Sequence, residues 1–223
     1  MVAHGRARRG TEALRRHERA FAWINLAAWI LVQLWSLHPR NFKAASALPL
    51  HVCDLASPLA TVAILRPDWR VARTVLFYWG LGLCTQAFLT PDLKEGMAHV
   101  AFWAFWLPHA GIVGSAVYDL AARDYRPGWS DLRDATIVTL SYAVVVFTID
   151  AMFGCNYGYL GRSGPDTPSA LDFLGPWPAR VGVMIAIGQA LFILMTLPFR
   201  PWKRLRESHD HSGEGVSPSH QRL

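Results

Sequence analysis

Apolar runs of about 20 residues, separated by short polar links, fill most of this 223-residue chain. Charged residues make up only 17% of the chain, against 52% hydrophobic residues, and they gather in the first twenty residues, the last twenty-four and the links. An α-helix of about 20 apolar residues is long enough to cross the roughly 30 Å of a bilayer's hydrocarbon core. The pattern therefore predicts an all-α, polytopic membrane protein and argues against an ordinary soluble domain.

The apolar runs predict a bundle of six transmembrane helices. The first run lacks a small-residue cleavage site, so it is expected to be retained as a span rather than removed as a signal peptide. A basic arm at 1–18 precedes the membrane domain at 19–199, and a basic, mostly disordered tail at 200–223 follows it. The predicted spans cover about residues 19–37, 48–65, 71–89, 97–121, 135–153 and 179–197.

Basic residues fall mainly in every second link, and this sets the expected orientation. With the N-terminus inside, the cytoplasmic segments hold 17 of the 22 lysines and arginines, and the outer segments hold five. An excess of Lys and Arg is typical of cytoplasmic loops. We therefore expect both termini in the cytoplasm, and this topology accounts for the net charge of +6 without a nucleic-acid partner.

Polar residues gather on the outer side of the predicted bundle. The second span opens with LPLHVCDLASPLA, residues 48–60, in which His51, Cys53 and Asp54 arrive within four residues. Ionisable side chains are costly in a bilayer and are functional candidates by default. The asymmetry predicts one site that opens toward the outer leaflet. Further polar residues on that side are Gln86, Asp92, His99, Asp150, Asn156, Tyr157 and Asp172, whereas His109 lies deeper in the fourth span.

Cys53 is the strongest candidate for covalent chemistry because it lies between a histidine and an aspartate. A thiol becomes a nucleophile when a nearby base withdraws its proton. His109 is the candidate base, with His51 as the alternative, and Asp54 or His51 would orient it. Cys84, in the third span, is interpreted as a packing residue. The cysteines have no metal-like spacing, so no metal or other cofactor is predicted.

Other interpretations of the same residues stay open at this stage. The polar cluster also suits the binding site of a small-solute transporter or of a ligand-binding membrane protein, and its histidines suit metal or haem ligands. Gln86 and Asn156 suit bridges between helices, and Asp54 suits a helix cap. A disulfide between Cys53 and Cys155, both on the outer side, would block the nucleophile.

The chain resembles the YwaF-like bacterial integral membrane proteins in four ordered blocks, LPLHVCDLASPL, FYWGLGLCTQAFLTPDL, FWLPHAGIVGSAVYDL and NYGYL…PSALDFLGPWP. The resemblance covers about residues 45–185. That family is similar, more distantly, to an animal transmembrane acyltransferase that makes polyunsaturated ether phospholipids through a proposed catalytic cysteine. The resemblance implies a multi-pass protein of the bacterial cytoplasmic membrane that acts on membrane lipids.

The resemblance also implies roles for single residues. Cys53 matches the proposed nucleophile and His109 matches the histidine of the fourth-span block. The chain departs from the pattern at Gly158, where a larger residue is expected, and at Ala179-Arg180, where aromatic residues are usual. We predict a membrane-embedded lipid-modifying enzyme that transfers an acyl chain, or hydrolyses it with water as the acceptor; no prediction is made of its oligomeric state. The predicted catalytic residues are Cys53 and His109, with His51, Asp54, Gln86, Asp92, Asn156 and Tyr157 in support.

Overall fold

The computed structural model describes residues 11–43, 47–91, 93, 95–163 and 170–199, and within these ranges it is helical and has no strands. This confirms the predicted all-α class. The longer helices are α2 (Glu12–Leu37), α3 (Val52–Leu65), α6 (Val100–Ala121), α7 (Trp129–Phe153) and α8 (Ala179–Thr196). Between α3 and α6 the chain forms α4 (Arg70–Val75), the π-helix η1 (Leu76–Leu83) and α5 (Gln86–Leu89). Short 3₁₀ turns are η2 (Tyr157–Tyr159), η3 (Ala170–Leu174) and η4 (Leu197–Phe199).

Four helices in the described part of the chain are long and apolar enough to cross a membrane. They are α2, α6, α7 and α8 with η4. The second predicted span corresponds to α3, an apolar helix of 14 residues, and the third is divided between α4, η1 and α5. The structure therefore confirms a membrane-type helical protein, and the count of six crossings stays a prediction. The predicted tail at 200–223 and most of the predicted arm, residues 1–10, lie outside the described residues.

Side-chain caps explain why two helices start earlier than predicted. The helix α2 starts before residue 19 because Thr11 Oγ1 accepts the Leu14 N–H at 3.3 Å. The helix α7 starts before residue 135 because Asp131 Oδ2 accepts the Gly128 N–H at 2.7 Å. Each cap satisfies a backbone amide that has no acceptor within its own helix.

The second helix starts later than predicted because the residues before it bind other parts of the chain. The helix begins at Val52 rather than at Leu48. His51 is its N-cap residue, and the His51 N–H donates to Asp54 Oδ2 at 3.2 Å. The Leu48 N–H donates to the Tyr157 hydroxyl oxygen at 3.2 Å. The segment before α3 therefore anchors the start of this helix to η2, which follows α7.

The third predicted span is not a continuous α-helix. Its centre, η1, is a π-helix, in which backbone hydrogen bonds join residues five apart; the Cys84 N–H, for example, donates to the Trp79 carbonyl at 2.7 Å. A Cβ atom at Gly80 would lie only 3.1 Å from Ala116 Cβ on α6, so the glycine lets η1 approach α6 closely. Short π-helical segments are rare and occur often at functional sites.

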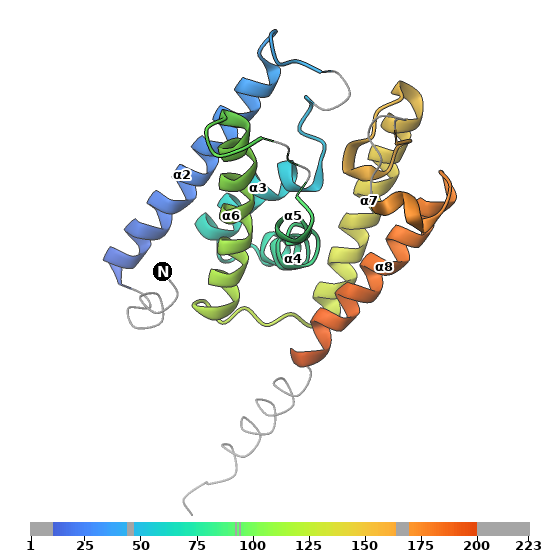
Figure 1. Cartoon of the computed structure of the whole chain (residues 1–223). Coiled ribbons are helices and arrows are strands. Elements are labelled where there is room, and N and C mark those ends of the chain that lie inside the picture. The colour runs from blue at the N-terminus through green and yellow to red at the C-terminus, as the bar shows by residue number, and fades with distance from the viewer. Residues whose placement is uncertain (1–10, 44–46, 92, 94, 164–169, 200–223) are drawn as a thin grey trace, which may run out of the picture.

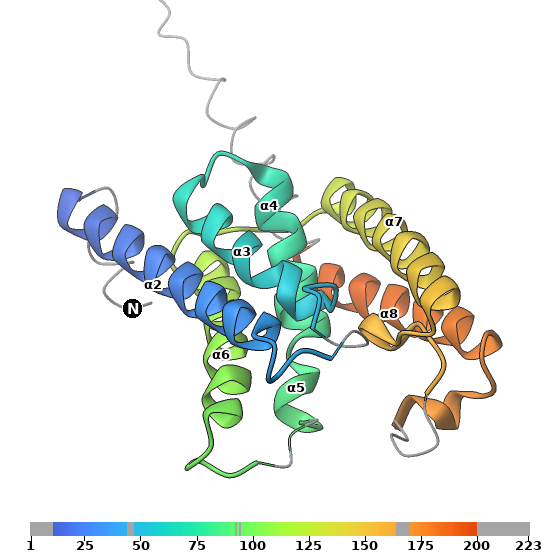
Figure 2. The same ribbon diagram turned by 90° about the horizontal axis from the view of Figure 1, so that it is seen from above.

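The helices form two groups that meet along α4, η1 and α5, which we call the third segment. One group consists of α2, α3 and α6, which pack against one another, and η1 packs on α3 and α6. The other group is the pair α7 and α8, which contact α4 and η1 respectively (Figures 1 and 2). Tyr78 lies in this contact, where its hydroxyl bonds Thr196 Oγ1 at 2.6 Å and its ring packs on Phe192.

Ion pairs tie the elements together at the end of the bundle where α2 starts and α8 ends (Figure 1). We call this set the charged cluster; the sequence analysis did not predict it, because its members pair across different elements. Each pair joins two segments that are far apart in the sequence. The pairs are Arg70 with Asp131 at 2.6 Å, Arg73 with Asp119 at 2.9 Å and Arg123 with Glu18 at 3.0 Å.

Candidate functional site

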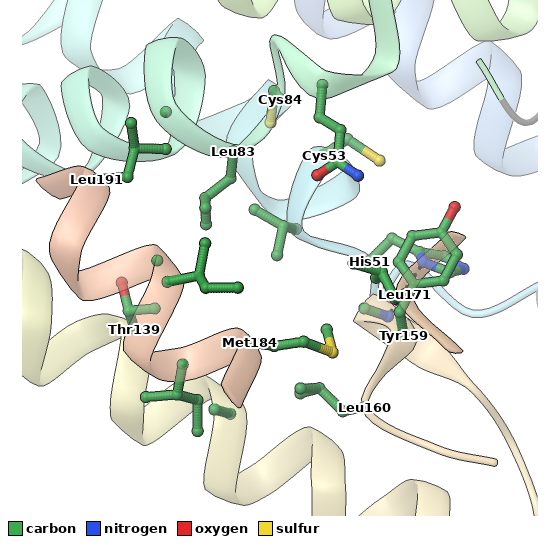
Figure 3. Close-up of a pocket in the computed structure, with 18 of the residues that line it drawn as sticks. His51, Cys53, Leu83, Cys84, Thr139, Tyr159, Leu160, Leu171, Met184 and Leu191 are labelled. Carbon is green, nitrogen blue, oxygen red and sulfur yellow. Dashed lines mark hydrogen bonds between the residues drawn. The ribbon is translucent and has the colours of Figure 1, made fainter. Parts of the chain in front are cut away.

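A cavity of about 330 Å³ lies between the two helix groups. Its walls come from the start of α3, from η1 and α5, and from α7 and α8, and the loop between α7 and α8 lines one end. Most of the lining side chains are apolar, among them Leu83, Leu160, Met184 and Leu191 (Figure 3). A mostly apolar space with a few polar groups is typical of a ligand site, and here it suits a hydrocarbon chain.

Cys53 is the second residue of α3, and its side chain lines this cavity. Figure 3 shows Cys84 nearby, at the end of η1, where it lines the same space. Cys53 is half-buried and Cys84 is buried. All three cysteines are free, so the disulfide between Cys53 and Cys155 is not formed. The thiol predicted to act as a nucleophile is therefore reduced and borders an apolar cavity.

His51 lines the cavity from the N-cap position of α3. The Gly158 N–H donates to His51 Nδ1 at 3.2 Å, so the neutral imidazole carries its proton on Nε2. The Tyr157 ring meets the His51 ring edge to face, with centroids 5.3 Å apart. His51 thus links α3 to the loop between α7 and α8, and Nδ1 is not open to take a proton.

His109 lies in α6 and is buried, with 8% of its surface exposed. Its Nδ1–H donates to the Phe105 carbonyl at 2.7 Å, and the two rings stack at a tilt with centroids 4.5 Å apart. Because Nδ1 carries the proton, Nε2 keeps a lone pair, as a general base requires. Phe105 lines the cavity, whereas His109, one helical turn along, is not among the described residues that line it.

Of the predicted supporting residues, Gln86 lines the cavity and Asp54 does not. Gln86, the first residue of α5, lines the cavity. Asp54 is not among the described lining residues: its Oδ2 accepts the His51 N–H and its Oδ1 accepts a hydrogen bond from Gln33 of α2 at 3.4 Å. Asp54 therefore caps α3 and joins it to α2, which positions the neighbouring Cys53.

Tyr157 and Asn156 shape the loop between α7 and α8 and are not among the described lining residues. Tyr157 is fully buried, and its N–H donates to Asp150 Oδ1 at 3.0 Å. Burial raises the pKa of Tyr157, so the hydroxyl keeps its proton. Asn156 Oδ1 accepts the Gly161 N–H at 3.0 Å. Asp92, the remaining predicted residue, lies outside the described residues.

Two consecutive residues of this loop have left-handed backbone conformations, Gly158 with a φ of +58° and Tyr159 with a φ of +61°. Both line the cavity. A Cβ atom at position 158 would lie 2.5 Å from the Tyr142 hydroxyl oxygen, which itself donates to the Leu50 carbonyl at 2.8 Å. The structure therefore gives a steric reason for the glycine found where the resemblance led us to expect a larger residue.

Arg180, the other departure from the expected pattern, holds the same loop in place. It is 2% exposed, and it donates to the Gly161 carbonyl at 2.6 Å and to Ser163 Oγ at 2.9 Å. It also forms an ion pair with Asp172. These contacts join the start of α8 to both described parts of the loop, and the loop in turn lines the cavity.

Five polar residues that line the cavity were not predicted, namely Thr90, Tyr159, Tyr142 and Thr139 of α7, and Gln189 of α8. Tyr142 and Thr139 lie in a helix rich in Thr and β-branched residues, where nothing in the spacing distinguishes a lining position. Gln189 did carry a signal, because a lone amide inside an otherwise apolar span is a functional candidate.

Comparison with known proteins places the chain in a family. No curated protein and no solved structure matches it. The model of the TMEM164 family matches residues 1–196, which include every helix described above except the short turn η4. The match covers the cavity and each residue discussed as part of the site. The chain therefore belongs to the TMEM164 family.

Proposed function

We propose that this protein is a membrane-embedded enzyme that transfers an acyl chain between lipids, with Cys53 as the nucleophile. One observation carries the proposal: the free thiol of Cys53 borders a cavity of about 330 Å³ whose walls are mostly apolar. Such a cavity suits an acyl chain whose ester carbonyl carbon lies beside the thiol of Cys53. The resemblance to a lipid acyltransferase with a proposed catalytic cysteine supports the same residue.

The proposal includes the topology. All six helical segments would cross the cytoplasmic membrane of a bacterium, with both termini inside. The basic residues favour this orientation, because 17 of 22 fall in the segments that it places inside. The start of α2 and the end of α8 lie at the same end of the bundle (Figure 1), as an even number of crossings requires.

The first chemical step forms a thioester. His109 lies one helical turn from Phe105 of the cavity wall, so its Nε2 must reach the cavity to take the Cys53 thiol proton; the thiolate then attacks the ester carbonyl of a donor lipid. The tetrahedral intermediate then expels the lipid's alkoxide, which takes the proton from His109 and leaves as a lysolipid alcohol. The acyl chain remains on Cys53 as a thioester.

The second step reverses the first with another acceptor. An acceptor hydroxyl gives its proton to His109 and attacks the thioester carbonyl, which releases the Cys53 thiolate. The proton returns from His109 to the thiolate. With a lipid hydroxyl as acceptor the enzyme is a transferase, and with water it is a lipid acyl hydrolase.

The start of α3 offers hydrogen-bond donors for the negative oxygen of both tetrahedral intermediates. The first N–H groups of an α-helix have no acceptor within the helix, and Val52 and Cys53, the first two residues of α3, both line the cavity. Donors placed at a developing oxyanion are worth about 100- to 1,000-fold in rate. The Gln86 amide, which also lines the cavity, is a further candidate donor.

The test is lipid turnover by purified protein in liposomes that contain a phospholipid with an isotope-labelled acyl chain and an unlabelled lysophospholipid. Cys53→Ala is expected to lose at least about 100-fold in transfer rate, because the nucleophile is removed. Cys84→Ala, the matched control in the same cavity, is expected to stay within a few-fold of wild type. Undiminished turnover by Cys53→Ala would reject the mechanism. Lipid binding without turnover by wild type would instead favour a ligand-binding or transport protein.

A further inference from the structure

We propose that the cavity wall around Thr139 of α7 and Gln189 of α8 is a subsite for an oxygen atom carried partway along the acyl chain. The substrate class would be lipids whose acyl chain bears a hydroxyl, keto or epoxide oxygen. This inference rests on the proposed function and narrows its substrate.

Polar groups from three elements converge at this place. The Trp79 Nε1–H of η1 donates to Thr139 Oγ1 of α7 at 2.8 Å. One turn along α7, the Thr136 hydroxyl donates to Gln189 Oε1 of α8 at 2.7 Å. Thr139 and Gln189 both line the cavity, and Figure 3 shows Thr139 across the space from His51. The cluster is therefore part of the cavity wall.

Two donors of this cluster remain unused. Thr139 accepts a bond from Trp79 and still has its own O–H to donate, and Gln189 accepts from Thr136 and still has its amide N–H groups. Among the described residues neither donor has an acceptor. A plain hydrocarbon chain would leave both donors without an acceptor, which costs free energy in an apolar environment. An oxygen atom on the chain supplies the missing acceptor.

The depth of the cluster fixes where along the chain that oxygen should be. Tyr142 is level with the start of α3, since its hydroxyl donates to the Leu50 carbonyl. At the rise of an α-helix, Thr139 is about 4.5 Å deeper than Tyr142, and Thr136 is about 9 Å deeper. If an acyl chain is attached at Cys53, the carbons that lie beside the cluster are therefore in the part of the chain near the carbonyl or in its middle, not at its methyl end. The oxygen is expected on those carbons.

The rest of the wall makes this subsite selective. Leu83, Met184 and Leu191 line the same cavity and offer no hydrogen bonds from their side chains. A site built to bond a substrate oxygen discriminates strongly against the analogue without it, because buried polar groups are then left unpaired. Oxygenated chains should therefore be preferred over their plain counterparts.

The experiment measures lipid retention by the full-length protein in nanodiscs, using native mass spectrometry. The probes are stearoyl phosphatidylcholine and three keto analogues of it. The analogues are isomers of one another and carry the keto oxygen near the ester carbonyl, at mid-chain or near the methyl end. Wild type is expected to prefer the near or mid-chain keto isomers over stearoyl lipid by about tenfold. Thr139→Val and Gln189→Leu should each reduce that preference several-fold while binding of stearoyl lipid is kept, and Thr139→Ser should restore it.

Thr148→Val is the control variant, because Thr148 is exposed on the same helix and bonds the Val144 carbonyl. It should keep the wild-type preference. Equal binding of stearoyl and keto lipids by wild type, or an unchanged preference in both variants, would overturn the subsite and leave the acyl-transfer proposal standing. No retention of any of these lipids would overturn the lipid function itself.

Discussion

Cys53 owes its position to the residues on either side of it. Asp54 caps α3 through the His51 N–H and reaches Gln33 of α2, and His51 accepts a bond from Gly158 of the loop between α7 and α8. The thiol between them is thereby fixed at the cavity wall. A nucleophile held by packed and hydrogen-bonded neighbours loses little entropy when it reacts. Positioning, rather than direct chemistry, is the role that the structure supports for Asp54.

The two histidines have opposite tautomers, and this separates their roles. Asn preserves the bond that each histidine makes through Nδ1, as acceptor in one case and donor in the other. His109→Asn is therefore expected to fold normally but to lose about 100-fold or more in acyl-transfer rate, because the base is gone. His51→Asn should stay within a few-fold of wild type. Rates in liposomes check both variants, and the reverse ranking would make His51 the base.

Gly158→Ala is predicted to destabilise the loop that lines the cavity. The new Cβ atom would sit 2.5 Å from the Tyr142 hydroxyl oxygen, and alanine would have to adopt a φ of +58°. We expect a loss of about 2–3 kcal/mol, measured as the free energy of unfolding in mixed detergent micelles. The added change Tyr142→Phe should recover part of the loss, since it removes the clashing oxygen. No loss in Gly158→Ala would contradict the left-handed conformation of this residue.

The sequence was enough to single out His51, Cys53 and Gln86, which the structure places around one cavity. Their signal was polarity inside apolar runs. This signal did not distinguish residues that line the cavity from residues that cap a helix. The residue type alone does not decide, because an aspartate such as Asp54 is common both at helix N-termini and in catalytic sites. The signal also missed Tyr142, whose position depends on how α7 is rotated toward α3 rather than on its own neighbours in sequence.

At the scale of elements, hydrophobic run length predicted where each helix is and was less accurate about where it starts. The early start of α7 depends on the cap by Asp131, which lies in a segment too polar to count as membrane-spanning. The π-helix η1 could not be predicted, because its extra residue per turn comes from packing around Gly80 rather than from a periodic pattern. The pairing in the charged cluster is likewise a tertiary effect.

Asp131 is predicted to be the most sensitive member of the charged cluster. It is 1% exposed, and it binds Arg70 through two bonds and also Thr74 and the Gly128 amide. Asp131→Asn should lower the free energy of unfolding by about 2–3 kcal/mol, because a buried carboxylate that accepts several hydrogen bonds loses its charge and one of its acceptor oxygens.

Asp134→Asn, on the same helix, is the control for this prediction. Asp134 pairs with Arg133 at the surface, and its loss should cost less than about 1 kcal/mol. Unfolding by added SDS in mixed micelles measures both variants. Equal effects of the two substitutions would show that burial of Asp131 does not matter to stability.

At the scale of the whole molecule, α2, α3 and α6 lie on one side and α7 and α8 on the other (Figure 2), and the cavity is lined by residues of both groups. The third segment is the partition, since it contacts α3 and α6 on one side and α7 and α8 on the other. A lipid chain bound in the cavity would contact both groups at once. The charged cluster holds the two groups together at one end, which leaves the other end, with its loop, to admit a ligand.

The topology predicts opposite sides for the two links that flank the third segment. Gly96 lies in open space before α6, and Asp68 is exposed between α3 and α4. Gly96→Cys and Asp68→Cys would each be made in a protein whose native cysteines are changed to Ala. A membrane-impermeant maleimide should label Gly96→Cys in intact cells and Asp68→Cys only after permeabilisation. Labelling of both from the same side would exclude a crossing by α4, η1 and α5.

Cys53 is proposed to be a reactive thiol at a lipid-binding cavity, and its rate of labelling by an electrophile tests this role. Purified protein in detergent would be treated with an acyl chain that ends in a chloroacetamide, and the modified cysteine identified by peptide mass spectrometry. Cys53 is predicted to react at least about tenfold faster than Cys84 and Cys155, and more slowly in His109→Asn. Slow labelling at equal rates for all three cysteines would contradict the account.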